Sequence, residues 1–488
     1  MNVAVRPRRD AAGGTPRVDP ARVGQAQAGP VGLLGLSLAV FLAGLLVLPP
    51  LWLGLVGVAL VVVAVRVQHE AVVVPAPSRS TPVVVFATAA VALWISAVAP
   101  FVSQPLTGGG LLLVATFAVL PITAVAACAV PVDRRVAVVV WCGAAAGASF
   151  AGIFGLVEVV VFGARRADGT TRNAIVFGDL SLVMALLTVV LMPLVRSVAA
   201  EGRYGTPVGR AVARWRLITA TGAMLGLAAT VVSGSRGAWL AVPVLAGVLA
   251  VRHRDALRAL GAARLAAACV AISVLVVRLS GSMPIDRTRS AIGEVRAYEA
   301  ARSPLDPAAG TSIGARFEAW RAALWATSEH ALTGVGWGNL QRQFGELAWA
   351  RYRNPRIARF DHAHHQLISA AANSGLPGLV AWCAVMVIPA RYFWRAAWHS
   401  SDSDQQSVGA AGLLVVFGYG VFGLTEAIFE QFVPLTFFAI VVALLLSQVD
   451  QSAERWSRGG SATGSNRRHR GHGHGVAGAR PGSEVTEE

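Results

Sequence analysis

Residues 136–162 read VAVVVWCGAAAGASFAGIFGLVEVVVF and contain one charged side chain, Glu158, close to their C-terminal end. A helix needs about 20 predominantly apolar residues to cross a bilayer, because the hydrocarbon core is about 30 Å thick. This stretch meets that requirement, so we expect it to form a transmembrane helix.

The rest of the chain has the same apolar character. Its 488 residues are 55% hydrophobic and only 14% charged, with a mean hydropathy of +0.58, whereas soluble domains are about 25% charged. Similar apolar runs recur along the chain and predict an all-α polytopic membrane protein with about twelve transmembrane helices. The candidate spans are residues 31–48, 51–65, 82–102, 108–130, 136–162, 174–195, 217–234, 237–251, 265–279, 377–394, 408–424 and 432–447.

Arginine sets the predicted orientation, because the chain contains no lysine. With the N-terminus in the cytoplasm, the arginines of residues 6–22, 66–79, 134–135, 196–216, 252–264, 391–395 and the C-terminal tail fall on the cytoplasmic side, as the positive-inside rule requires. Long loops are exempt from that rule, so the eleven arginines within residues 280–365 are compatible with an external location. The predicted organisation is a disordered cytoplasmic segment (1–30), helices 1–9 (31–279), a large helical extracytoplasmic loop (280–376), helices 10–12 (377–447) and a disordered cytoplasmic tail (448–488).

Charge placement argues against two classes of function. The formal net charge of +16 does not indicate nucleic-acid binding, because the arginines are spread over helix ends without a basic, aromatic-interleaved stripe. A transporter is expected to place polar groups at mid-depth in broken helices. The ionisable residues in or directly beside the predicted spans lie instead near the outer ends of the helices, and they are Glu158, Asp179, Arg236, Arg278, Glu426 and Glu430.

Two arginines, Arg236 and Arg316, stand at positions in the sequence that suit anion binding. Arg236 lies at an outer turn in SGSRGAWL (233–240), where Gly237 opens the next helix. A guanidinium beside unpaired helix N–H groups suits a phosphate, although an interfacial arginine that only reaches lipid headgroups is the alternative. Arg316 lies in the predicted first turn of an amphipathic surface helix in the segment GARFEAWRAALWATSEHALTGVGWGN (314–339). A cation is unfavourable at that end of a helix, so an anionic ligand would explain its position.

Three histidines stand within four positions, His362, His364 and His365, immediately before an apolar run. The following residues favour a helix that ends at Gly375, so we expect the imidazoles to lie on a short helix at the outer membrane surface. Histidine can accept a proton near neutral pH, which suits deprotonation of an external hydroxyl. Metal binding together with Asp361 is not expected, because the i, i+4 ligand pair of zinc proteases is absent. Solvated histidines without a role are the other alternative.

Together these stretches resemble the O-antigen ligase superfamily of bacterial envelope enzymes, which includes the O-antigen polymerases and the protein O-oligosaccharyltransferases. The resemblance covers roughly residues 110–445 and is carried by residues 233–240, 316–340 and 362–382 and by the plan of about twelve helices with one large external loop.

The resemblance implies a donor glycan held on a polyprenyl (undecaprenyl) pyrophosphate and transferred to an acceptor hydroxyl without a nucleotide, another cofactor or a metal. It implies that Arg236 and Arg316 bind the pyrophosphate and that His364 is the catalytic base. His362 and His365 are expected to contact substrate beside it. His365 stands where asparagine is common in the family, and Asn373 stands where a glutamate often precedes the Gly-x-x-Gly pattern.

The function predicted from the sequence is therefore an O-antigen ligase-like membrane glycosyltransferase of cell-surface polysaccharide assembly. Its site would face the outside of the bacterial inner membrane, and its acceptor would be a glycan, a lipid or the cell wall. A polysaccharide polymerase of the same superfamily uses the same donor and stays open as an alternative. A lipid-linked glycan transporter is the alternative from another class.

Overall fold

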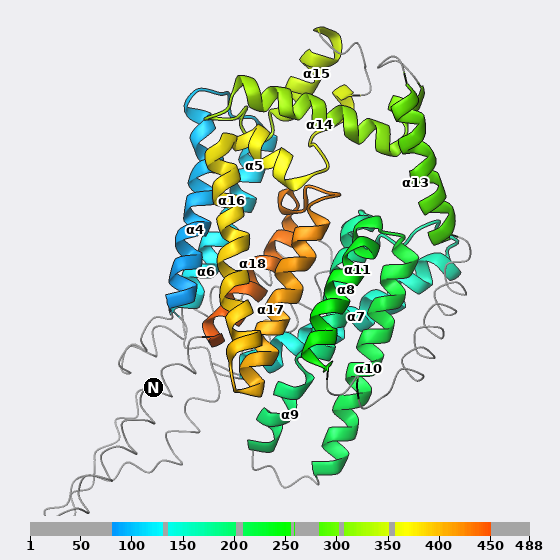
Figure 1. Ribbon diagram of the computed structural model, residues 1–488, viewed down its shortest axis with the longest axis vertical. Coiled ribbons are helices and arrows are strands. Elements are labelled where there is room, and N and C mark those ends of the chain that lie inside the picture. Colours follow the sequence, from blue (N-terminus) through cyan, green and yellow to red (C-terminus); the bar gives the residue numbers. More distant parts are fainter. Residues whose placement is uncertain are drawn as a thin grey trace, which may run out of the picture.

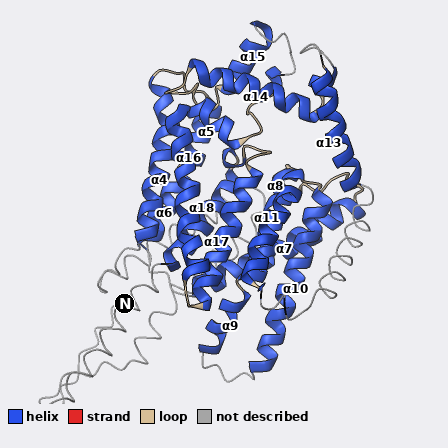
Figure 2. Cartoon of the chain, in the orientation of Figure 1, coloured by secondary structure: helices blue, strands red, loops and turns tan. Residues whose placement is uncertain are grey.

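The computed structural model describes residues 81–129, 135–201, 208–254, 258, 283–301, 307–350 and 357–449. All regular secondary structure in these residues is helical, which confirms the predicted all-α class (Figure 2). Most helices stand side by side in a bundle, and α14 lies across one end of it (Figure 1). The α-helices are α4 (Thr81–Val98), α5 (Gly108–Phe117), α6 (Val119–Ala129), α7 (Arg135–Val160), α8 (Ala174–Val190), α9 (Met192–Glu201), α10 (Val208–Ser233), α11 (Arg236–Arg252), α13 (Met283–Ala300), α14 (Ser312–Glu329), α15 (Leu340–Ala350), α16 (Gln366–His399), α17 (Ser403–Phe422) and α18 (Phe432–Val449). Short 3₁₀ helices are η1 (Ala99–Val102), η2 (Gly169–Thr171), η3 (Pro307–Gly310), η4 (Ile357–Arg359) and η5 (Ile428–Glu430).

Seven helical segments in the described residues are long and apolar enough to cross a membrane, and α8 with α9 forms an eighth candidate that is bent by 45°. The chain is therefore a multi-pass membrane protein. The predicted spans at 31–48, 51–65 and 265–279 and the predicted disordered segment 1–30 lie outside the described residues. So does the predicted disordered tail (448–488), except that Gln448 and Val449 belong to α18, which runs two residues further than the predicted last span. Each of the other predicted spans overlaps one or two of the described helices, and 237–251 corresponds to the 17-residue α11.

Small residues allow the helices of the bundle to approach closely. A Cβ atom at Gly152 of α7 would lie 2.4 Å from the carbonyl oxygen of Leu225 in α10, and one at Gly226 would lie 2.8 Å from the Cβ of Ala185 in α8. Van der Waals packing between small residues is the main attraction between helices in a lipid environment. These contacts explain why α7, α8 and α10 form one packed unit.

A break in α16 separates its first turns from its membrane-spanning part. Gly375 adopts φ +66° and ψ −169°, which interrupts the helix where the sequence predicts an end. The loop after α14 covers the break: the N–H groups of Val335 and Gly336 donate to the carbonyl oxygens of Ala372 and Asn373, both at 2.9 Å. Any side chain at Gly334 would meet the backbone of Asn373 at 2.4 Å. The start of α16 is therefore fixed against the layer that contains α14.

Candidate active site

Arg236 is the first residue of α11, within one residue of where the sequence places the helix start. Ser235 caps this helix, because its Oγ accepts the N–H of Ala238 at 3.3 Å. The same hydroxyl donates to Oδ1 of the buried Asp179 in α8 at 2.7 Å. The cap therefore ties the backbone of Arg236 to a neighbouring helix of the bundle.

Arg316 approaches the same region from α14. It is the fifth residue of that helix, which begins at Ser312, so the prediction of a first-turn position was wrong by one turn. The helix begins earlier because Thr311 supplies the N-cap, with its Oγ1 3.2 Å from the N–H of Gly314. Glu294 of α13 also accepts the N–H of Ile313 at 2.9 Å and so holds this end of α14.

Both arginines line one cavity of about 170 Å³. Arg166, from the loop between α7 and α8, is a third arginine in its wall. The remaining lining residues are Ile175, Gly237, Ser312 and Thr425. Burial lowers the pKa of the Arg316 guanidinium and Arg236 lowers it further, whereas Glu426 and Glu294 raise it. Three guanidinium groups around one small cavity form a site suited to a multiply charged anion.

The histidines lie beside this cavity and do not line it. His362 and His364 precede α16 in an irregular segment, and His365 occupies the N-cap position of that helix. The expectation that they lie on a helix was therefore wrong. The helix starts only at Gln366, whose N–H donates to the carbonyl oxygen of Gly423 at 2.7 Å and whose Oε1 accepts the N–H of Phe429 at 2.9 Å. These two bonds bring the turn between α17 and α18 against the histidines.

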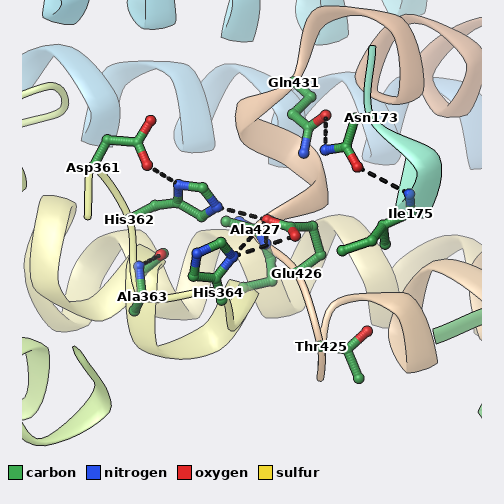
Figure 3. Close-up of polar contacts among 12 residues, drawn as sticks. Asn173, Ile175, Asp361, His362, Ala363, His364, Thr425, Glu426, Ala427 and Gln431 are labelled. Atoms are coloured by element: carbon green, nitrogen blue, oxygen red, sulfur yellow. Dashed lines mark hydrogen bonds and ion pairs between the residues drawn. The ribbon is translucent and has the colours of Figure 1, made fainter. Parts of the chain in front are cut away.

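Glu426 in that turn joins two of the imidazoles (Figure 3). Its Oε1 lies 2.6 Å from Nε2 of His362, and both of its carboxylate oxygens lie 3.3 Å from Nδ1 of His364. Asp361 contacts Nδ1 of His362 from the other side. The carboxylate of Glu426 is 2% exposed, so water screens these interactions little. Thr425, the residue before Glu426, lines the arginine cavity and so connects the two parts of the site.

The neighbouring carboxylates favour the protonated, positively charged form of His362. Burial lowers the pKa of His362, but hydrogen bonds from its imidazolium to Asp361 and Glu426 outweigh that effect and raise the pKa to about 11. Burial likewise raises the pKa of Glu426, while its hydrogen bonds to His362 and His364 hold the pKa well below the usual range. His362 is therefore a cation at neutral pH, and Glu426 is ionised.

His364 and His365 differ from His362 in their surroundings. His364 adopts φ +51°, in the left-handed region that residues other than glycine rarely occupy outside functional sites or turns. His365 makes no hydrogen bond to Glu426 in the described part of the chain, and its ring stands edge-on to Trp320 with centroids 5.3 Å apart. Burial lowers the pKa of His365. The structure therefore brings His362 and His364 together and leaves His365 packed against α14.

Side chains of His362, His364 and Glu426 could also hold a metal ion, because their candidate ligand atoms lie within 4.8 Å of one another. Asp361 would then orient His362, as second carboxylates do in many metal sites. The histidine segment has no i, i+4 ligand pair of its own, but Glu426 supplies a third ligand from the turn between α17 and α18. The absence of a metal stays a prediction.

Sequence reasoning missed two residues of this arrangement. Glu426 was noted only as an ionisable group at a helix end, and Arg166 was not considered. Arg166 belongs to a loop of mixed polar residues, GARRADG (163–169), in which nothing distinguishes it from Arg165. Its position at an outer helix connection was the one available signal.

Fold and site together define a multi-pass membrane protein with an arginine-lined cavity and an adjoining carboxylate–histidine cluster. Residues 221–383 match the family model described as O-antigen ligase. This match confirms the resemblance to the O-antigen ligase superfamily that the motifs indicate, and it supports a membrane glycan ligase- or polymerase-type function. It includes Arg236, Arg316 and the three histidines, whereas Arg166 and Glu426 lie outside it.

A curated relative is an uncharacterized protein of Haemophilus influenzae, which is 24% identical over 179 residues. The aligned region covers 35% of this chain and 41% of the relative, so the chain spans less than half of the length of the relative it matches.

Proposed function

We propose that this protein is a glycosyltransferase that moves a glycan from a polyprenyl-pyrophosphate carrier to an acceptor hydroxyl on the outer face of the bacterial inner membrane. The observation that carries the proposal is that Arg236 and Arg316, which are far apart in sequence, line one cavity beside a carboxylate-bound histidine pair. The acceptor is a glycan, a lipid or the cell wall, and its identity decides between ligase and polymerase.

In this proposal, the arginines bind the pyrophosphate of the donor. Guanidinium groups form charge-assisted hydrogen bonds with phosphate oxygens, and their fixed geometry holds the donor in place. The pyrophosphate leaves with the electron pair of the bond to the sugar, so negative charge grows on it during transfer. Arginines that are already in position stabilise that charge without any rearrangement of the site during the reaction. In comparable sites one such donor group lowers the activation free energy by about 3 to 4 kcal/mol.

His364 is the base in this proposal, and Glu426 orients it. An ionised Glu426 accepts a hydrogen bond from Nδ1 of His364, so Nε2 is left as the proton acceptor. As the acceptor hydroxyl oxygen bonds to the anomeric carbon, its proton moves to Nε2, and attack opposite the leaving group inverts that carbon. His362 is less suited to this role, because it already carries a proton at neutral pH. It serves instead to keep Glu426 ionised and in position.

Transfer should proceed in the presence of EDTA and without a nucleotide. Purified protein in nanodiscs would receive a polyprenyl-pyrophosphate-linked oligosaccharide, with membranes from host cells lacking this protein as the source of acceptor. We expect consumption of the lipid-linked glycan and formation of a larger glycan product, because the chain's own arginines and histidine carry the reaction. Failure to consume the donor under any condition would contradict the proposed function. Loss of transfer with EDTA and recovery with a divalent ion would assign His362, His364 and Glu426 to a metal instead.

Cysteine labelling tests the location of the site. Glu299 of α13 and Gln341 of α15 are exposed, so Glu299→Cys and Gln341→Cys should react with a membrane-impermeant thiol reagent in intact cells. Arg395, exposed near the other end of α16, should give a cysteine that reacts only after lysis. The parent chain provides the background from its own cysteines. The reverse pattern would place α13 to α15 in the cytoplasm, where the proposed donor carrier and acceptor would not meet the site.

A further inference from the structure

Arg166 is held in a defined position in the wall of the cavity that also contains Arg236 and Arg316. Its Nε donates to the carbonyl oxygen of Ser233 at 2.7 Å, at the C-terminal end of α10. That hydrogen bond fixes the direction of the Nε–H group and leaves the two terminal nitrogens of the fork to contact a ligand. The side chain is therefore anchored to a helix of the bundle.

The loop that contains Arg166 is fixed on both sides. The N–H of Ala167 donates to the carbonyl oxygen of Val232 at 3.1 Å, and Ala167 is fully buried. Further along, a carboxylate oxygen of Glu158 accepts the N–H groups of Asp168 and Gly169, both at 3.1 Å. A charged group on such a rigid loop loses little conformational entropy when it binds a ligand. Arg166 thus has the support expected of a binding residue.

The charges around the cavity also call for a ligand with more than a single negative charge. Among the described residues, the cavity lining contains three arginines and no carboxylate. A monophosphate is matched by fewer guanidinium groups than a pyrophosphate, which has a second phosphate, more negative charge and additional oxygens to contact.

We infer that Arg166 is a third binding residue for the pyrophosphate and that it makes the site select a pyrophosphate carrier over a monophosphate carrier. This inference rests on the proposed function and adds a residue that determines specificity. Arg236 and Arg316 hold the anion from α11 and α14, while Arg166 reaches it from the loop between α7 and α8.

Binding of two short-chain polyprenyl probes, a pyrophosphate and a monophosphate with the same prenyl chain, tests this inference on the purified full-length protein in nanodiscs. The parent should bind the pyrophosphate at least about tenfold more tightly. Arg166→Gln should weaken pyrophosphate binding by about tenfold to a hundredfold, the effect of a lost hydrogen bond to a charged group, and should leave monophosphate binding nearly unchanged. The preference would then be lost.

Arg165→Gln is the matched control, because Arg165 is the exposed neighbour and its removal changes the net charge equally. This variant should keep the preference of the parent. Arg166→Lys keeps the positive charge but lacks the planar guanidinium group that bonds to Ser233. This variant should fold even if Arg166→Gln proves unstable, and its preference for the pyrophosphate should lie between those of the parent and Arg166→Gln.

The possible results distinguish an error in the role of Arg166 from an error in the proposed function. A parent that binds neither probe would overturn both the pyrophosphate donor and the role of Arg166. A parent that prefers the pyrophosphate, with the same preference in both Arg166 variants, would overturn only the inference. Equal loss of preference in Arg165→Gln would also overturn it, since net surface charge would then account for the effect.

Discussion

Replacing His364 with alanine is expected to abolish glycan transfer while leaving donor binding nearly intact. The reason is that the proposed base receives the proton of the acceptor hydroxyl, whereas the arginines bind the donor. Loss of a general base costs about 10²- to 10⁴-fold in rate, so the residual transfer should be that far below the parent. Product formation from the lipid-linked donor measures the rate, and a thermal shift with a polyprenyl pyrophosphate measures binding.

Variants of the neighbouring residues test the separate roles. Glu426→Gln removes the charge that orients His364, so it should lower the transfer rate substantially with little effect on donor binding. His362→Ala should have a smaller effect than His364→Ala, because His362 acts only through Glu426. His365→Ala should be the mildest, since His365 packs against Trp320 instead of joining the cluster. If His364→Ala transfers glycan at the rate of the parent, His364 is not the base. If, in addition, His362→Ala is inactive, His362 is the base instead.

Arg236→Lys and Arg316→Lys are each expected to reduce kcat/KM by about 10²- to 10³-fold, the effect of losing one donor group that stabilises transition-state charge. Lysine keeps the positive charge but lacks the planar fork that contacts two phosphate oxygens together. Donor affinity should fall as well, because the same contacts are made before the reaction. Initial rates of transfer over a range of donor concentrations provide kcat and KM separately.

Arg321→Lys is the matched control for Arg316→Lys. Arg321 lies on the same helix with its side chain 63% exposed and pairs with Glu318, away from the cavity lining. This variant should transfer at nearly the parent rate. If both cavity variants bind and react like the parent, the cavity is not the pyrophosphate site and the proposed mechanism is wrong.

The helical, membrane-embedded class of the protein could be predicted from the sequence, since it follows from composition and run length. Residues 136–162 contain too few polar groups for any other environment, and α7 occupies Arg135–Val160. Local signals also placed Arg236 at a helix start and ended the first turns of α16 at Gly375. These features depend on neighbours within a few residues, because hydrogen bonds in helices and caps are local.

Local signals failed where a distant contact decides the conformation. His362 and His364 were expected on a helix because the residues after them favour one. The helix instead begins at Gln366, whose backbone and side chain bond to the turn between α17 and α18. Propensity is a weak preference, and tertiary hydrogen bonds in a buried site override it.

By itself the sequence determined that the chain is an all-α membrane protein and that arginines and histidines gather at predicted outer helix ends. Only the tertiary structure decided which of them share a site. It placed Arg166 in the cavity with Arg236 and Arg316, and it set Glu426 between His362 and His364 while leaving His365 outside that cluster. The physical reason is that helix formation depends on local bonds along the chain, whereas an anion cavity and an ion-paired cluster depend on how helices distant in sequence pack together.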